Sequence, residues 1–194
     1  TSTTFVGTLD GAIKSDSANN VKAGTTALDS LTTGSSNVAV GQNALTANTT
    51  GAENVAVGNN AMQLNTTGAS NVAVGRDALV NNNASNNVAI GALALNDNTT
   101  GTRNTAVGAY ALDAATTVDD NTAFGYAALS SNTTGVENTA IGSGAMDQNT
   151  TGTDNTAIGW RSLYNNNANY NTAVGNYALY TNTTGCLLYT SPSP

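Results

Sequence analysis

Seven residues in the C-terminal half of the chain could recognise a ligand through aromatic stacking and charge. They are Tyr110, Tyr126, Trp160, Arg161, Tyr164, Tyr177 and Tyr180. Aromatic rings give a large contact area at a low entropic cost, so exposed rings beside an arginine suit stacking on sugars or contact with a receptor protein. Tyr164 and Tyr180 fall at the same position of adjacent repeats, and rings in that relation can also serve only to stabilise neighbouring strands. The first interpretation predicts a contact site for a glycan or a protein receptor.

The sequence lacks most of the residues that usually carry out catalysis. The chain has no histidine and one cysteine, which removes the commonest general base, most zinc sites and an intrachain disulfide framework. No phosphate-binding loop is present, so we expect no catalytic residue, no cofactor and no metal site, and we expect that the protein is not an enzyme. One alternative is a polysaccharide-cleaving pair of carboxylates in a groove between chains, for which Asp147 or Asp154 near Trp160 gives the only hint.

Acidic residues outnumber basic ones by 12 to 5, for a net charge of −7. This balance argues against a nucleic-acid partner, because phosphate backbones attract cations. Carboxylates near the ends of repeats could bind calcium, but the Gly-Gly-x-Gly-x-Asp signature of calcium-binding rolls is missing, so solvated charges are favoured. These residues are Glu53, Asp119, Asp120, Glu137 and Asp154. The sequence has no run of 18 apolar residues, which argues against direct membrane insertion of this segment.

A repeat of 17 residues organises the chain. It follows the glycines Gly24, Gly41, Gly58, Gly75, Gly91, Gly108, Gly125, Gly142, Gly159 and Gly175, and two of the steps between them are 16 residues. The consensus unit is Asn-x-Ala-Val-Gly-x-x-Ala-Leu-x-x-Asn-Thr-Thr-Gly-x-x, whose positions are numbered 1 to 17 below. Such a period predicts a solenoid in which every unit is stabilised by its neighbours.

The units divide the chain into three segments. Residues 20–185 hold about ten repeats, and residues 1–19 are a lead-in segment or a degraded repeat. Residues 186–194, from Cys186 to Pro194, break the pattern in mid-unit. They resemble the translation of a sequencing-library adapter, so we expect them to be non-native, with a genuine capping tail as the alternative. We also expect the chain to be an internal piece of a longer protein.

Two short apolar clusters per unit, at positions 2 to 4 and 8 to 9, predict strands, because each is too short for a helix. The glycines at positions 5 and 15 of the unit are expected at turns where a positive φ could be required. The asparagines at positions 1 and 12 of the unit are expected to form ladders. Turns stacked at the strand spacing of about 4.8 Å would give an all-β rod roughly 50 Å long.

The columns of the repeat predict which side chains face inward. Position 4 carries Val, Ile or Phe and is expected to form the core, so that aspartate at Val107 or Ile141 should unfold the rod. Position 3 is an alanine column, which strand alternation sends to the opposite face. Such a narrow coil buries little by itself, so we expect identical chains to pack side by side around an axis, as a homotrimer.

Consecutive threonines at positions 13 and 14 raise one more possibility. Threonine ladders occur on ice-binding solenoids, but a consecutive pair in an extended strand faces opposite ways. A role in the turn explains these pairs with fewer assumptions, and ice binding is kept as a lesser alternative.

The unit motif resembles a known family. The segments 37–41, 87–91 and 138–142 (Asn-Val-Ala-Val-Gly, Asn-Val-Ala-Ile-Gly and Asn-Thr-Ala-Ile-Gly) are similar to the Asn-Ser-Val-Ala-Ile-Gly motif in the YadA-like head repeats of trimeric autotransporter adhesins. The longer unit with its Asn-Thr-Thr-Gly turn resembles related repeats of phage tail fibres and bacterial surface proteins.

This resemblance implies a left-handed parallel β-roll, a homotrimer and attachment to a host cell or matrix. We therefore expect an extracellular structural and adhesive rod. It would belong either to a bacterial surface, through an outer-membrane anchor in a missing segment, or to a virion tail fibre. Its expected partner is a host-surface glycan or protein receptor. A carbohydrate-processing, depolymerase-like fibre segment is the alternative.

Overall fold

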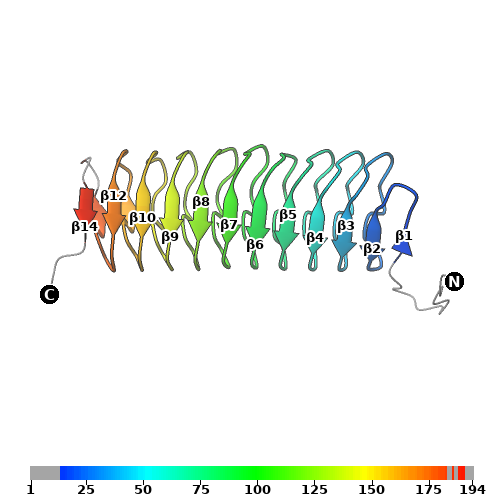
Figure 1. Ribbon diagram of the computed structural model, residues 1–194, viewed down its shortest axis with the longest axis horizontal. Helices are drawn as coiled ribbons and strands as arrows, with labels where there is room; N and C mark the ends of the chain where they lie inside the picture. Colours follow the sequence, from blue (N-terminus) through cyan, green and yellow to red (C-terminus); the bar gives the residue numbers. More distant parts are fainter. Residues whose placement is uncertain (1–13, 183–184, 186–187, 191–194) are drawn as a thin grey trace.

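The computed structural model describes residues 14–182, 185 and 188–190, and these form one straight solenoid of short strands (Figure 1). The strands of the long sheet are β1 (Lys14–Ser15), β2 (Val21–Ala23), β3 (Val38–Val40), β4 (Val55–Val57), β5 (Val72–Val74), β6 (Val88–Ile90), β7 (Thr105–Val107), β8 (Thr122–Phe124), β9 (Thr139–Ile141), β10 (Thr156–Ile158), β12 (Thr172–Val174) and β14 (Leu188–Thr190). A second sheet pairs β11 (Asn165–Asn166) with β13 (Thr181–Asn182). The prediction of an all-β solenoid built on this repeat is confirmed.

Each strand of the long sheet pairs in parallel with the strand one repeat later, apart from β1, which pairs antiparallel with β2. The register matches equal positions of the unit, as in Ala39 with Ala56. The 16-residue units keep this register, since Val72 pairs with Val88. Hydrogen bonds therefore run from coil to coil along the whole rod, and no coil has to be stable alone.

The interior of the coil is filled by alanine at positions 3 and 8 and by leucine or methionine at position 9. Ala56, Ala61 and Met62 are fully buried, as are their equivalents in the coils on either side. A coil of 17 residues leaves room for only a methyl group where its strand faces inward. The bulky side chain needed to fill the space comes instead from position 9.

The predicted core column is wrong. The Val, Ile and Phe side chains of position 4 point outward, with Ile90 40% exposed and Phe124 55% exposed. Strand alternation does place positions 3 and 4 on opposite faces, as expected. Sequence reasoning gave the larger side chain to the interior, whereas the narrow coil admits the smaller one.

The segment from position 7 to position 9 is a turn in every described coil, which corrects the second predicted strand. Positions 7 and 9 both have positive φ, for example Asn60 at 57° and Met62 at 51°. The left-handed region is unfavourable for β-branched residues. This explains why position 9 is Leu or Met in every repeat although position 4 accepts Val and Ile.

The two repeated glycines are required for different reasons. Gly58, at position 5, has a φ of 140°, which side chains rarely adopt. Gly68, at position 15, is not in that region, so the prediction of positive φ is wrong for it. A Cβ there would lie 2.4 Å from Oδ1 of Asn65 and 2.3 Å from the carbonyl oxygen of Ala84 in the next coil. Close packing of coils, and not a turn, selects this glycine.

The predicted asparagine ladders are present, and both lie inside the rod. At position 1, the backbone N–H of Asn54 donates to Oδ1 of Asn37 at 3.0 Å, and Nδ2 of Asn54 donates to the Gly68 carbonyl at 2.8 Å. At position 12, Nδ2 of Asn65 donates to Oδ1 of Asn48 at 3.0 Å. Buried amides are stable here because the neighbouring coils satisfy them.

One coil interrupts the ladder of position 12. It has Ala115 in place of asparagine and Val118 in place of the following glycine, and both are buried. Oδ1 of Asn98, in the preceding coil, is buried without a hydrogen-bond partner, and so is Oδ1 of Asn149, which is followed by Asn166 in the next coil. The two substitutions belong together, because a side chain at position 15 occupies the place of the asparagine Oδ1.

The ends of the described chain depart from the regular coils. β1 and the turn at Asp16 cover the first coil, beside a hollow of about 390 Å³ lined by Asn20, Lys22 and Leu28 among others. At the other end β14 continues the parallel register on β12, with Ala173 opposite Tyr189. The origin of residues 186–194 stays a prediction, and residues 1–13 of the predicted lead-in segment lie outside the described residues.

Candidate interaction site

The outward face of the long sheet is a uniform, uncharged surface that runs along the rod. It is defined here as the sheet face, made by the side chains of positions 2 and 4 from β3 to β12. Position 2 changes from valine to threonine between Val88 and Thr105, and position 4 is Val, Ile or Phe throughout. No charged residue occupies either column between Val38 and Val174.

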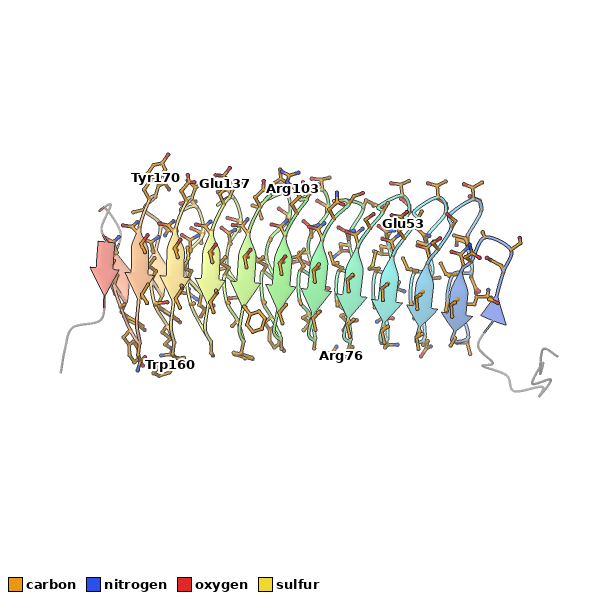
Figure 2. All side chains as sticks on the ribbon, viewed as in Figure 1. Glu53, Arg76, Arg103, Glu137, Trp160 and Tyr170 are labelled. Atoms are coloured by element: carbon orange, nitrogen blue, oxygen red, sulfur yellow. The ribbon has the colours of Figure 1, made fainter. Side chains whose placement is uncertain are left out.

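The predicted ligand-contact residues separate into groups along one edge of the rod, where the chain leaves the strand. Five of them form one group, defined here as the aromatic cluster: Trp160, Arg161, Tyr164, Tyr177 and Tyr180. The cluster spans two adjacent coils and lies on the edge that also carries Arg76 (Figure 2). These side chains occupy positions 6, 7 and 10, which the repeat leaves variable.

Ring contacts hold the aromatic cluster together. Tyr164 and Tyr180 are stacked, with centroids 4.9 Å apart and planes 6° from parallel. Trp160 meets Tyr177 edge to face at 4.6 Å, and Tyr177 meets Tyr180 at 5.2 Å. The predicted stacking of Tyr164 and Tyr180 in one column is confirmed. Trp160 is still 45% exposed and Tyr177 is 42% exposed, so the cluster is both self-supporting and open to solvent.

Arg161 lies over two of these rings. Its guanidinium carbon is 5.1 Å from the centre of the Trp160 ring and 5.3 Å from that of Tyr164. Position 7 has positive φ in this coil too, at 51°. Cation–π contacts of this kind orient the guanidinium without using its N–H donors, which stay available to a ligand.

A carboxylate limits the cluster on one side. Partial burial, the nearby charge of Asp147 and a hydrogen bond with that carboxylate raise the pKa of Tyr164. Asp147 also accepts a hydrogen bond from the hydroxyl of Ser130, one coil earlier. Asp147 therefore places a negative charge beside Tyr164.

The other predicted aromatic contacts lie apart from this cluster. Tyr110 and Tyr126 form a separate edge-to-face pair with centroids 5.8 Å apart. The coil between Tyr126 and Trp160 has Ser143 and Gly144 at positions 6 and 7, so the aromatic strip is interrupted. Tyr170, which is not one of the predicted contact residues, stands at position 17 and lies on the opposite edge of the rod (Figure 2).

That opposite edge carries one of the three ion pairs of the described residues, together with a pair of neighbouring carboxylates. Arg103 forms a bidentate ion pair with Asp120, at 2.6 and 2.7 Å, which lowers the pKa of Asp120. Next to it, a hydrogen bond and charge repulsion from Asp154 raise the pKa of Glu137. Asp154 therefore lies beside Glu137 and not beside Trp160. The proximity of Asp154 to Trp160 that the sequence suggested is absent. Among the described residues, no group of three or more Asp, Glu, His or Cys side chains could hold a metal ion.

The threonine pairs belong to the turn at positions 13 and 14. The backbone N–H groups of Thr49 and Thr50 both donate to the carbonyl oxygen of Thr66, at 2.9 and 3.2 Å. The hydroxyl of Thr49 donates to the same oxygen at 3.0 Å. The first threonine of the pair thus joins consecutive coils, as the turn interpretation expects.

Sequence reasoning missed the sheet face, because it placed position 4 in the core. The signal was present in position 2, where threonine replaces valine from residue 105 onward while position 3 stays alanine. A column that tolerates a hydroxyl beside invariant small residues indicates that the outer face is the partly solvated one.

The geometry defines a parallel β-solenoid with an uncharged sheet face and an aromatic edge. Comparisons of the chain with known protein families, with curated proteins and with solved structures find no match. Within the described part of the chain, no helix is long and apolar enough to cross a membrane.

Proposed function

We propose that this chain is a structural rod segment that associates with identical chains through its sheet face, as a homotrimer, and attaches a larger assembly to a surface. The observation that carries the proposal is the run of outward apolar side chains from Val40 to Val174, uninterrupted by charge. We still expect lateral association of the chains, but through the side chains of position 4 and not through the alanines of position 3. The alanines fill the coil, and the position 4 side chains face the partner.

The size of the sheet face supports this role. With a strand spacing of about 4.8 Å and about 3.3 Å per residue, the nine three-residue strands from β3 to β12 cover roughly 43 Å by 10 Å. The resulting area of about 430 Å² is similar to the largest apolar patches of soluble monomers, which are often functional. A partner chain with the same face would bury it along the whole rod without leaving an unpaired charge.

The attachment role rests on the resemblance of the unit to YadA-like head repeats. In that interpretation the rod is extracellular, as part of a bacterial surface adhesin or a phage tail fibre. The trimer axis runs along the sheet faces, and the turn edges of the three chains face outward. Residues on those edges, including the aromatic cluster, are then free to contact a host-surface glycan or protein receptor.

A pair of matched substitutions tests the association. Ile141→Asp places a charge on the sheet face, whereas Leu64→Asp places the same charge at position 11, where Leu64 is 48% exposed. Light scattering should show that Ile141→Asp reduces the particle to the chain mass of 19.4 kDa while its circular dichroism stays β-rich. Leu64→Asp should keep the wild-type mass. Equal masses for the two variants would refute association through this face.

A second function, ice binding, is favoured by one specific observation. Position 2 is threonine in the strands β7, β8, β9, β10 and β12, so hydroxyl and methyl groups form a regular outward column beside the aliphatic one. This column differs from the threonine pairs of the turn, which bond to the neighbouring coil. Thermal hysteresis in a freezing assay, abolished by substituting Thr139 with Lys, would support this function; no hysteresis would exclude it.

A further inference from the structure

We propose that the aromatic cluster is a binding site for an acidic saccharide, in which Arg161 binds the carboxylate of a uronic acid and the neighbouring rings stack on pyranose faces. The proposal deepens the attachment role by naming a ligand class. It does not depend on association of the chains, because the cluster lies on a turn edge and not on the sheet face.

The first step concerns the state of Arg161. From Lys22 onward the described chain contains four cations, and three of them have a carboxylate partner within 4.0 Å: Lys22 with Asp29, Arg76 with Asp77, and Arg103 with Asp120. Arg161 has none. In a protein with a net charge of −7, a guanidinium whose donors are unused is the local feature that can attract an anion.

The second step concerns the geometry of the anion. The guanidinium is held over the Trp160 and Tyr164 rings, so its planar fork projects from an aromatic surface. Carboxylates and phosphates both match this fork in a bidentate way, and a uronic acid carries its carboxylate directly on a sugar ring. A ligand that satisfies both features carries a carboxylate next to a flat apolar surface of its own.

The third step concerns that apolar surface. Trp160, Tyr177 and Tyr180 stay 45%, 42% and 38% exposed although they touch one another. Rings held by contacts on adjacent coils lose little further freedom when a ligand binds, which favours affinity. A pyranose has a flat, apolar C–H face and a polar rim. The aromatic cluster likewise combines apolar ring faces with polar tyrosine hydroxyls.

The fourth step concerns Asp147, which bounds the cluster beside Tyr164. Its carboxylate accepts a hydrogen bond from the hydroxyl of Ser130, and burial together with its charge raises the pKa of Tyr164. Its charge would nevertheless repel an acidic ligand. The proposal therefore predicts opposite effects for two neighbouring residues: removing the charge of Arg161 weakens binding, and removing that of Asp147 strengthens it.

Trp160 is the only tryptophan of the chain, so its fluorescence reports directly on the site. The full-length chain is titrated with trigalacturonate and, in parallel, with the neutral trisaccharide maltotriose. Trigalacturonate should change the emission in a saturable way, and maltotriose should bind at least tenfold more weakly. Arg161→Gln should weaken trigalacturonate binding at least tenfold, and Asp147→Asn should strengthen it severalfold.

Arg76→Gln is the matched control, since Arg76 lies on the same edge but away from the cluster (Figure 2). This variant should bind trigalacturonate like the wild type. Absence of a saturable change with either sugar would overturn the site. Equal affinity for the two sugars, or equal effects of Arg161→Gln and Arg76→Gln, would overturn recognition of the carboxylate. Light scattering on the same samples separates this outcome from a failure of association.

Discussion

The interrupted asparagine ladder allows a sharp prediction about coupling between Ala115 and Val118. In the neighbouring coils, a Cβ at position 15 would lie 2.5 Å from Oδ1 of Asn98 or 2.6 Å from that of Asn132. Asparagine at 115 is therefore compatible with glycine at 118 and not with valine. The double variant Ala115→Asn/Val118→Gly should restore the ladder, and each single variant should disrupt it.

The magnitudes follow from the contacts. Ala115→Asn alone overfills a buried site and leaves its amide without good partners, at a cost of about 2–4 kcal/mol. Val118→Gly alone removes three buried carbons and adds backbone freedom, at a cost of about 3 kcal/mol. In the double variant the new amide fills the vacated space and gives Oδ1 of Asn98 the donor that it lacks. The double effect should therefore be small, and the sum of the single effects, about 5–7 kcal/mol, should exceed it by at least about 3 kcal/mol.

Urea unfolding of the four proteins, followed by circular dichroism at one fixed protein concentration, measures this coupling. The concentration is held constant because association shifts the apparent stability. A coupling within about 0.5 kcal/mol of zero, the usual limit for independent sites, would refute the steric explanation of the glycine at position 15.

Three further predictions concern the core, the backbone and the charged edge. Ala106→Asp should unfold the rod because Ala106 is fully buried, whereas Val107→Asp should leave the β-rich circular dichroism intact; equal loss of signal would contradict the face assignment. Leu112→Ile should lower the free energy of unfolding by about 1–2 kcal/mol, because φ is 51° at this residue, while Leu112→Met, a residue used by other repeats, should be nearly neutral in the same urea assay. Glu137 has its pKa raised above the ordinary 4.5 by Asp154, so its protonated form is favoured in the folded state and its contribution to stability falls as pH rises through the raised value. The melting temperature should therefore fall less between pH 4.5 and 7 in Glu137→Gln than in the wild type. The same fall in both proteins would contradict the contact between Glu137 and Asp154.

The sequence was sufficient to predict the period, the stacking of the coils and the asparagine ladders. Each of these depends on a column, and a column repeated ten times is visible without a structure. The outward aromatic positions were predicted for the same reason, since variable positions of a solenoid are those that its core does not constrain.

The assignment of inside and outside at positions 3 and 4 could not be obtained from hydrophobicity alone. Val57 is more apolar than Ala56, yet the interior of this narrow coil is set by volume, and only Ala56 fits. The positive φ of Met62 and the close approach at Gly68 are likewise consequences of the coil dimensions. The division of the aromatic residues between two edges depends on where each turn points.

The mass of the wild-type chain in solution tests the central claim most directly, namely that the uncharged sheet face is covered by identical chains. Light scattering after size exclusion, over a hundredfold range of concentration, should give a β-rich particle of three times the chain mass of 19.4 kDa. A β-rich particle that keeps the mass of a single chain over the whole range would contradict the account.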